Sequence, residues 1–470
     1  MSKAGRQVLS LCTTIFLARQ LTPEEFGAVA VILGVLALGL PLQEADLVAA
    51  TVQRARVSVQ AISTMFWINA TLGLTLTLLF AAMASPLADF LRQPELVPLC
   101  HALSLTFVLN GLAAQHRALL QRSMRFGTTT WIDLGSALTG GLGAIVMALA
   151  GFGYWALVAQ WLIGDTLALL MLISVVRWKL TRPSFTAEVR DMVSFGAPLL
   201  GFNIVLAFAN NLHVVLLGRG VGTAAAGHYT RAYALASIPQ SLLQTAASHV
   251  ATAKLSRAQA NRAGFATFYC SGVQLLSLVA LPVVIAFVGF GDQLALLVYG
   301  SQWGEASRLL PIFAIGLAVV PLLHSTGPLF VALGRSRDML RWGMFGSLVM
   351  VTGTLIGLRW GTTGVAIGWS TSMLVLVLPG LVYSFRGTDI TLGRVAHSIG
   401  GIYAAAICGL GLAWLARQLV GGLPAISELV LGLSFSLLGY FALCYFAFGQ
   451  KALMRDVVQR LRHAPGRPST

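Results

Sequence analysis

The stretch Phe16-Leu-Ala-Arg19-Gln-Leu-Thr-Pro-Glu-Glu-Phe-Gly27 decides the fold, because a weaker copy of it returns 200 positions later. The copy reads Leu216-Leu-Gly-Arg219-Gly-Val-Gly-Thr-Ala-Ala-Ala-Gly227 and keeps a Leu, an Arg and a Gly in register. A second echo pairs Leu120-Gln-Arg122-Ser123 with Leu333-Gly-Arg335-Ser336. Two echoes in the same order predict an internal duplication, with chance similarity between apolar segments as the alternative.

The composition excludes a soluble protein. Of the 470 residues, 57% are hydrophobic and 10% are charged, and the mean hydropathy is +0.80. Soluble domains carry about 25% charged residues, since long exposed surfaces need them. The chain is therefore predicted to be an all-α protein that crosses a membrane many times.

A bilayer core of about 30 Å needs roughly 20 apolar residues per helix. Fourteen stretches bounded by charge, Pro or Gly meet this requirement, with limits near 5–19, 27–50, 61–83, 96–116, 128–150, 154–176, 192–217, 224–250, 264–289, 308–332, 340–359, 363–385, 396–416 and 425–448.

The distribution of charge indicates which way the spans run. With the N-terminus inside, the inward segments hold 24 basic residues and five acids, whereas the outward segments hold six basic residues and seven acids. Cytoplasmic loops of membrane proteins retain Lys and Arg. The asymmetry, 24 − 5 = +19 inside against 6 − 7 = −1 outside, thus predicts an even number of spans with both termini in the cytoplasm.

The echoes follow the first and seventh spans and the fourth and tenth spans. They predict an N-terminal lobe over 1–183 and a C-terminal lobe over 184–388, each of six helices, followed by two further spans in 389–448 and a basic cytoplasmic tail over 449–470. Two lobes related in this way usually enclose a central cavity and move against each other, which predicts alternating access. The tail could dock a partner or anionic lipid, or simply reflect the retention of positive charge in the cytoplasm.

No enzyme signature is present. The sequence has no Gly-rich phosphate loop with Lys and Ser or Thr, no zinc-type His pair and no nucleophile beside a base, so we expect neither catalysis nor a cofactor. Its five cysteines are widely spaced and lie mostly in apolar runs. They are interpreted as packing residues rather than as disulfides or metal ligands.

Ionisable residues inside the spans are costly and tend to face a cavity. Glu44 and Asp46 follow Pro41 in the second span, where the proline should loosen the helix. Two acids two residues apart cannot share one helix face, so at least one should turn inward. Asp133 is interfacial in the alternative interpretation, and Asp165 pairs with a neighbouring helix.

A carrier of phosphate or pyrophosphate needs Arg or Lys in its cavity, with polar amides alongside. The arginines that could meet an anionic headgroup are Arg54, Arg56 and Arg231, and the amides that could bind sugars are Gln43, Gln53, Asn203, Asn210 and Asn211. Glu44 or Asp46 could then bind a coupling proton or sodium ion.

Each assignment has a structural alternative. Arg54 and Arg56 could be ordinary basic residues of a cytoplasmic loop, and Arg231 could snorkel to the outer surface. Asn210 and Asn211 could serve helix packing.

Further motifs carry a family resemblance from about residue 5 to 345, and their order and spacing together are specific. In addition to the stretch at 16–27, they are Ala49-Ala-Thr-Val-Gln-Arg54, Gln115-His-Arg-Ala-Leu-Leu-Gln-Arg-Ser-Met-Arg-Phe126, Gly153-Tyr-Trp-Ala-Leu157, Leu217-Gly-Arg219, Tyr229-Thr-Arg-Ala-Tyr233, Lys254-Leu-Ser-Arg257 and Gln302-Trp303 ahead of Leu309-Leu310. On these residues the chain resembles the polysaccharide transporters of the multidrug/oligosaccharidyl-lipid/polysaccharide (MOP) superfamily, especially the exopolysaccharide branch of the oligosaccharide flippases.

The resemblance implies twelve or fourteen helices in two lobes and a role in flipping a polyprenyl-pyrophosphate-linked sugar unit from the cytoplasmic to the periplasmic leaflet of the inner membrane. It implies a lipid-linked oligosaccharide and membrane lipids as partners, with polysaccharide polymerase and export proteins as further partners and no nucleic acid. The sequence departs from the family pattern at Asn210-Asn-Leu-His213 and at Glu44-Ala-Asp46-Leu47, which indicates an altered ion site. A cation-coupled drug exporter of the same superfamily and a non-transporting scaffold are the alternatives.

Overall fold

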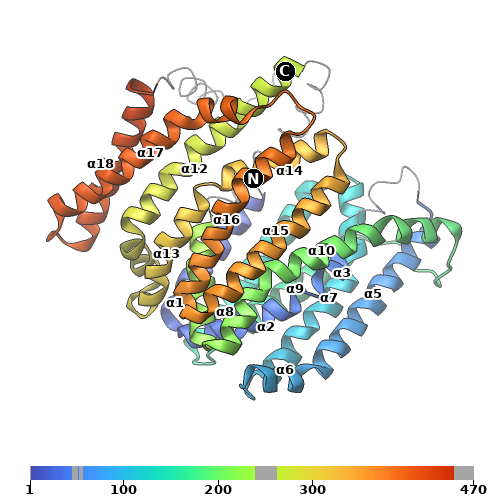
Figure 1. Ribbon diagram of the computed structural model, residues 1–470. Helices are drawn as coiled ribbons and strands as arrows, with labels where there is room; N and C mark the ends of the chain where they lie inside the picture. Colours follow the sequence, from blue (N-terminus) through green and yellow to red (C-terminus); the bar gives the residue numbers. More distant parts are fainter. Residues whose placement is uncertain (1, 45–50, 52–56, 239–261, 449–470) are drawn as a thin grey trace, which may run out of the picture. The chain divides into compact units, whose positions relative to one another are not determined.

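A computed structural model describes residues 2–44, 51, 57–238 and 262–448. In these ranges the regular elements are helices, and β-structure is confined to one isolated bridge between Gly421 and Leu423 (Figure 1). The predicted all-α class is confirmed.

Contact density divides the chain into two compact units. The first comprises residues 1–230 and 354–365, and the second comprises 231–353 and 366–470. The lobe limits predicted at 183 and 388 stay a prediction.

Long helices make up the first unit. They are α1 (Ser2–Gln20), α2 (Pro23–Leu36), α3 (Leu40–Glu44), α5 (Val59–Ala82), α6 (Ala84–Leu91), α7 (Leu96–Arg122), α8 (Phe126–Leu149), α9 (Trp155–Val175), α10 (Ala187–Gly220) and the short η2 (Leu358–Trp360). A further helix begins at Thr223 and is described as far as residue 238.

The second unit is also built from helices. Its elements are α12 (Arg262–Tyr299), η1 (Ser301–Trp303), α13 (Gly304–Leu317), α14 (Val320–Ala332), α17 (Leu392–Val420) and α18 (Ala425–Phe446), with most of α15 (Ser336–Gly357) and α16 (Gly361–Phe385).

Eight helices in the described ranges are long and apolar enough to cross a membrane, or nine if a bent pair counts as one span. That pair is α13 with α14, bent by 47° where the sequence predicted a single span over 308–332. The predicted number of fourteen spans stays a prediction.

The second predicted span is also interrupted. Instead of one helix over 27–50, α2 ends at Leu36 and α3 starts at Leu40. Pro41 cannot donate to the carbonyl group of Ala37 and its ring crowds that carbonyl, so the helical ladder breaks one turn before the proline. The expected loosening effect of Pro41 is therefore present as a break in the helix.

Close helix pairs in the first unit depend on small residues. At the α5–α7 contact, a Cβ atom on Gly73 would lie 2.6 Å from the carbonyl oxygen of Phe107, and one on Gly111 would lie 2.5 Å from that of Asn69. Between α8 and α9, a Cβ on Gly140 would lie 2.5 Å from the carbonyl oxygen of Gln160. Small interface residues of this kind let helix backbones approach within a membrane, where hydrophobicity provides no force between helices.

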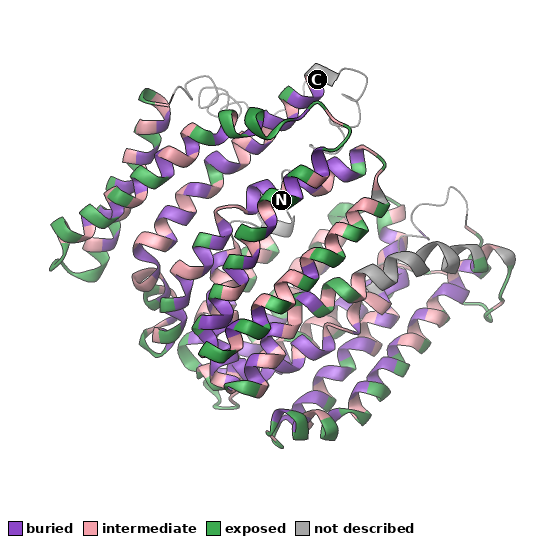
Figure 2. Cartoon of the chain, viewed as in Figure 1, coloured by how far each residue is buried: buried purple, intermediate pink, exposed green. Residues whose placement is uncertain are grey.

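Packing in the second unit centres on α12, which contacts α13, α17 and α18. Helices α17 and α18 carry many exposed residues (Figure 2). Among them are the apolar residues Trp414, at 66% exposure, and Leu438, at 70%. Such residues match lipid rather than water as the surrounding medium. Of the five cysteines, all free, Cys100, Cys270 and Cys444 are buried as expected, whereas Cys12 and Cys408 are exposed and do not pack.

The first sequence echo corresponds to a repeated local structure. Helix α1 ends at Gln20 and α2 begins at Pro23, while α10 ends at Gly220 and the next helix begins at Thr223. The turn hydrogen bonds also match, from the Leu21 amide to the Leu17 carbonyl at 2.8 Å and from the Val221 amide to the Leu217 carbonyl at 2.9 Å. The offset of 200 in sequence is thus an offset of 200 in structure.

The second echo is displaced by three residues from the predicted pairing. The left-handed residue of the turn is Met124 (φ 55°) in one copy and Gly334 (φ 66°) in the other, an offset of 210. The following amides confirm it, because Arg125 donates to Leu120 and Arg335 donates to Phe330. Arg335 therefore corresponds to Arg125 and not to Arg122.

The copies of the first echo touch each other. A Cβ atom on Gly27 would overlap the carbonyl group of Thr223, and one on Gly227 would overlap the carbonyl group of Pro23. Pro23 and Thr223 are themselves equivalent under the offset of 200. The contact of Gly27 with Thr223 is therefore repeated, with the two copies exchanged, by the contact of Gly227 with Pro23. Reciprocity of this kind marks a local two-fold relation, as in an isologous interface.

This contact makes a stability prediction. Gly27→Ala should destabilise the protein by about 1–3 kcal/mol, because the added methyl group forces two backbones apart. The matched control is Gly127→Ala in α8, where nothing lies within 4 Å of the added Cβ and helix propensity favours Ala. Thermal unfolding of the purified variants in detergent measures both, and equal melting temperatures would contradict the close approach.

Candidate functional site

Gln43 is a predicted binding residue that the structure places inside the first unit. It lies in α3 with 3% of its surface exposed, and its Nε2 donates to the backbone oxygen of Phe107 in α7 at 2.6 Å. Its Oε1 is buried and accepts no hydrogen bond. Gln43 therefore offers one acceptor to a group that enters beside α7.

Two further buried amides lie on α5 and α7. Asn69 of α5 is 1% exposed, and neither its Nδ2 nor its Oδ1 has a hydrogen-bond partner among the residues that the structure describes. Gln115 of α7 is fully buried, its Nε2 donates to Thr51 Oγ1 at 3.4 Å, and its Oε1 has no partner. Nearly all buried polar groups in proteins have a partner or an ordered water, so these atoms call for one.

Gln43, Asn69 and Gln115 form what we term the amide row. Gln43 lies at the level of Phe107, Asn69 lies at the level of Gly111, and Gln115 is one further turn along α7. Successive members are about 6 Å apart along the helix axis, the rise of four residues. The atoms left without partners are three amide oxygens and one amide nitrogen, so the row suits hydroxyl groups or water, which can both donate and accept.

The end of the amide row at Gln115 contacts Thr51, which precedes the predicted arginines in the sequence. Arg122 donates through Nη1 to the backbone oxygen of Thr51 at 2.8 Å, and Gln115 contacts the hydroxyl group of the same residue. Thr51 is fully buried. Helix α7 therefore anchors the chain three residues before Arg54.

Several predicted site residues lie outside the described part of the chain. These are Asp46, Gln53, Arg54 and Arg56, and the side chain of Glu44 at the end of α3 is likewise outside it. Their roles stay predictions.

The asparagines of α10 do not join the amide row. Asn211 donates to the carbonyl group of Ala207 at 2.8 Å, one turn back in its own helix. Asn210 is exposed and Asn203 is half-buried. The Asn211 side chain therefore bonds within its own helix. Binding by Asn203 and Asn210 stays a prediction.

Arg231 lies in the second unit, on the helix that begins at Thr223. Its side chain is half-buried, and the Tyr299 hydroxyl group of α12 donates to its backbone oxygen at 3.3 Å. Tyr299 thus fixes the backbone from which this guanidinium extends.

The acids within the spans have partners on neighbouring helices. Asp133 of α8 forms an ion pair with Arg117 of α7 at 3.3 Å. Asp165 of α9 accepts a hydrogen bond from Asn110 of α7 at 3.3 Å. For Asp165 the expected pairing with an adjacent helix is confirmed.

Sequence reasoning missed Asn69, Gln115 and Arg122 as site residues. Asn69 and Gln115 are single amides within apolar runs, and Arg122 is one of many basic residues in the predicted inward segments. A usable signal exists, because Asn69 and Gly73 are four residues apart, as are Gly111 and Gln115. An amide one turn from a glycine indicates a polar group at a close helix contact.

The fold is that of polytopic helical membrane transporters. The lipid II flippase MurJ, in an inward closed conformation, superposes with a TM-score of 0.78 over 97% of this chain and 98% of its own, at 13% identity. An inward-facing multidrug resistance MATE transporter of the MOP superfamily superposes with a TM-score of 0.68 over 81% of this chain and 93% of its own, at 18% identity.

The chain belongs to the family described as polysaccharide biosynthesis protein, whose sequence model matches residues 16–308. It is 25% identical to the succinoglycan biosynthesis transport protein ExoT of Rhizobium meliloti (strain 1021), over 98% of this chain and 94% of that protein. It is also 25% identical to the lipopolysaccharide biosynthesis protein WzxC of Escherichia coli (strain K12), over 80% of this chain and 79% of the relative. The resemblance seen in the sequence is confirmed.

The amide row makes its own prediction. Asn69→Leu should leave the protein at least as stable as the wild type, and by up to about 1–3 kcal/mol more stable, because it removes two buried groups without partners. Asn211→Leu is the matched control, since it breaks the hydrogen bond to Ala207 and gains nothing comparable. A marked fall in the melting temperature of Asn69→Leu would show that Asn69 has partners in the native protein.

Proposed function

We propose that this protein flips a polyprenyl-pyrophosphate-linked oligosaccharide repeat unit across the inner membrane, for the synthesis of an exopolysaccharide or another surface polysaccharide. One observation carries the proposal: a relative named as a transport protein of succinoglycan biosynthesis matches almost the whole chain. The family match over residues 16–308 supports it independently.

The mechanism follows from the chemistry of such a substrate. Its polyprenyl tail is stable in lipid, whereas its pyrophosphate and sugars are not, because each charge at the centre of a bilayer costs at least about 2.5–3.5 kcal/mol. The protein has to replace water around the headgroup while the tail stays in the hydrocarbon. Alternating access of two lobes does this without opening a continuous pore.

In this proposal arginines neutralise the pyrophosphate and amides replace water around the sugars. Arg54, Arg56 and Arg231 hold the anion, because a guanidinium binds phosphate oxygens in a bidentate manner. The amide row supplies hydrogen bonds, together with Gln53, Asn203 and Asn210. Glu44 and Asp46 bind the coupling ion.

The orientation is part of the proposal. Both termini lie in the cytoplasm, so the segments rich in Lys and Arg face the leaflet in which the substrate is made. The N-terminal lobe extends over 1–183, and the C-terminal lobe over 184–388.

Arg231→Ala should abolish polymer export while leaving the amount of protein in the membrane unchanged, because a cavity without this cation binds the headgroup too weakly. Arg231→Lys keeps the charge but loses the planar fork and should restore export in part. The matched control is Arg308→Ala, which removes an exposed arginine of the same unit and should export normally. Polymer is measured outside cells that express each variant, and normal export by Arg231→Ala would remove Arg231 from the site.

Flipping itself is tested in vesicles. Proteoliposomes with lipid-linked sugar in one leaflet should expose it in the other leaflet when the protein is present, as measured by a membrane-impermeant label. Empty vesicles and vesicles with the Arg231→Ala variant are the controls. Labelling at the same rate in all three preparations would contradict the proposal.

A drug exporter is the second candidate, because the fold is also similar to a multidrug resistance transporter. It would confer resistance to cationic compounds and would depend on Glu44 and Asp46 rather than on the arginines. A non-transporting scaffold would tolerate loss of any single charge. Export by Arg231→Ala cells together with resistance lost in Asp46→Asn cells would select the exporter.

A further inference from the structure

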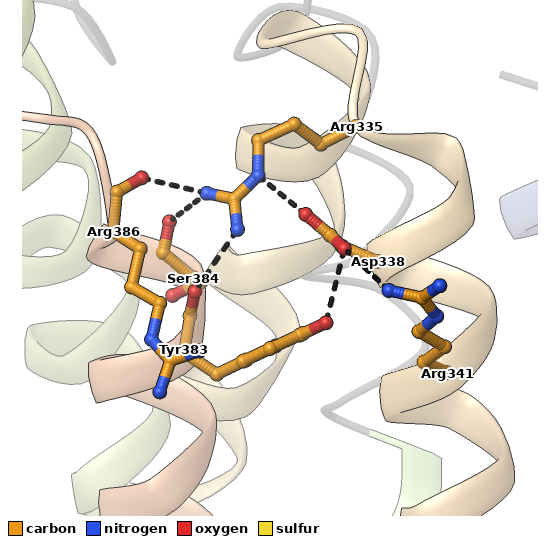
Figure 3. A network of polar contacts seen from close by, with 6 residues as sticks. All are labelled: Arg335, Asp338, Arg341, Tyr383, Ser384 and Arg386. Atoms are coloured by element: carbon orange, nitrogen blue, oxygen red, sulfur yellow. Dashed lines mark hydrogen bonds and ion pairs between the residues drawn. The ribbon is translucent and has the colours of Figure 1, made fainter.

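Three helix ends meet in the second unit around Arg335. Helix α14 ends just before this residue, α15 begins just after it, and α16 ends at Phe385. The Arg335 guanidinium donates to the backbone oxygens of Tyr383, Ser384 and Arg386 at 3.3, 3.2 and 2.7 Å (Figure 3). It thereby satisfies carbonyl groups that the last turn of a helix leaves without partners.

Asp338 balances this arginine. Its Oδ2 accepts from Arg335 Nε at 2.8 Å, and its Oδ1 accepts from the Tyr383 hydroxyl group at 3.1 Å. Both carboxylate oxygens are therefore engaged by groups that hold the turn together. The charge of Asp338 and that of Arg335 cancel within the fold.

Two more arginines lie beside this turn, one near the Asp338 carboxylate and one over the Tyr383 ring. Arg341 Nη1 is 3.8 Å from Asp338 Oδ1, and the Arg341 side chain is 75% exposed. Arg386 is exposed and lies over the Tyr383 ring, 5.2 Å from the ring centroid. In the part of the chain that the structure describes, no second carboxylate contacts either arginine. The cluster of three arginines and one aspartate carries a net charge of +2.

Apolar and aromatic side chains continue from the arginines along α15. Trp342 stacks on Tyr383 with ring centroids 6.1 Å apart, and it contacts Phe345 with centroids 5.6 Å apart. Phe345 and Met344 are 49% and 52% exposed. Arginine at a helix end with aromatic residues beside it is the arrangement found at the membrane–water interface.

We propose that Arg341 and Arg386 bind the phosphate of an anionic membrane phospholipid. The two guanidinium groups are held by Asp338 and Tyr383 at the end of the helices, where a lipid phosphate lies, and Phe345 and Met344 contact the chains beneath it. Guanidinium groups bind phosphate in a bidentate manner, and basic clusters between transmembrane helices bind acidic headgroups. The site is separate from the amide row and does not rest on flipping.

The site predicts a preference for phosphatidylglycerol over phosphatidylethanolamine, because only the former has a net negative charge. The double variant Arg341→Ala/Arg386→Ala should bind phosphatidylglycerol about 30-fold more weakly, since each basic residue near the headgroup increases the affinity about fivefold. Arg335 and Asp338 stay in place in this variant, so the turn should remain folded. The matched control, Arg308→Ala/Arg359→Ala, removes two exposed arginines at other helix ends and should bind as the wild type does.

The experiment uses the purified full chain in detergent. Native mass spectrometry counts the phosphatidylglycerol molecules retained as the lipid is titrated, and phosphatidylethanolamine is titrated in parallel. Loss of one tightly bound phosphatidylglycerol in the Arg341/Arg386 double variant but not in the control is the expected result. Equal retention by both double variants would overturn the site, and so would displacement of the lipid by an equal concentration of soluble pyrophosphate, which would assign the arginines to a soluble anion.

Discussion

The close approach of Gly27 and Gly227 is the constraint on which the arrangement of the first helices depends. At this contact backbone meets backbone, so any side chain on either residue would separate α2 from the helix that begins at Thr223. The contact is reciprocal, because Gly27 lies against Thr223 and Gly227 lies against the equivalent residue, Pro23. In a membrane such a contact relies on packing and on weak Cα–H to carbonyl interactions, since lipid gives apolar side chains no reason to associate. A duplicated sequence keeps its two copies in register by repeating the one residue that permits the contact.

The same need for close packing explains why the polar interior lies where it does. On α5 and α7 the glycines that allow the helices to touch alternate with Asn69 and Gln115, one turn away in each case. A buried amide without partners is destabilising by roughly 1–3 kcal/mol, so a stripe of small residues alone would have given a more stable helix pair. Packing alone therefore does not explain why these two positions carry amides. Arg122 and Gln115 then connect this interior to Thr51, three residues before Arg54 in the sequence.

Helix positions could be predicted from the sequence because length and hydropathy determine them, and α5, α8 and α16 begin and end within a few residues of the predicted spans. The pairing of residues within the second echo could not be predicted from the sequence. The search matched the identities of Arg122 and Arg335, whereas the structure repeats a left-handed turn residue, and Met124 gives no sign of that conformation in its sequence. Gln43 was among the predicted site residues, as an amide that could bind sugars. Asn69 was not found, since its position opposite Gly111 depends on how α5 and α7 pack.

The distribution of acids bears on which molecule such an interior can carry. Arg117 neutralises Asp133, Arg417 neutralises Asp292 at 2.6 Å, and Arg335 neutralises Asp338. In each case the acid forms an ion pair with an arginine that joins two elements, so the carboxylate is not available to a cationic substrate. Asp165 is hydrogen-bonded to an amide instead. An exporter of cations needs carboxylates that are free to bind them, whereas a carrier of anions needs only that its arginines outnumber the acids. In the described part of the chain, none of these four acids is free to bind a cation, so the carboxylates that a cation exporter needs are not found among them.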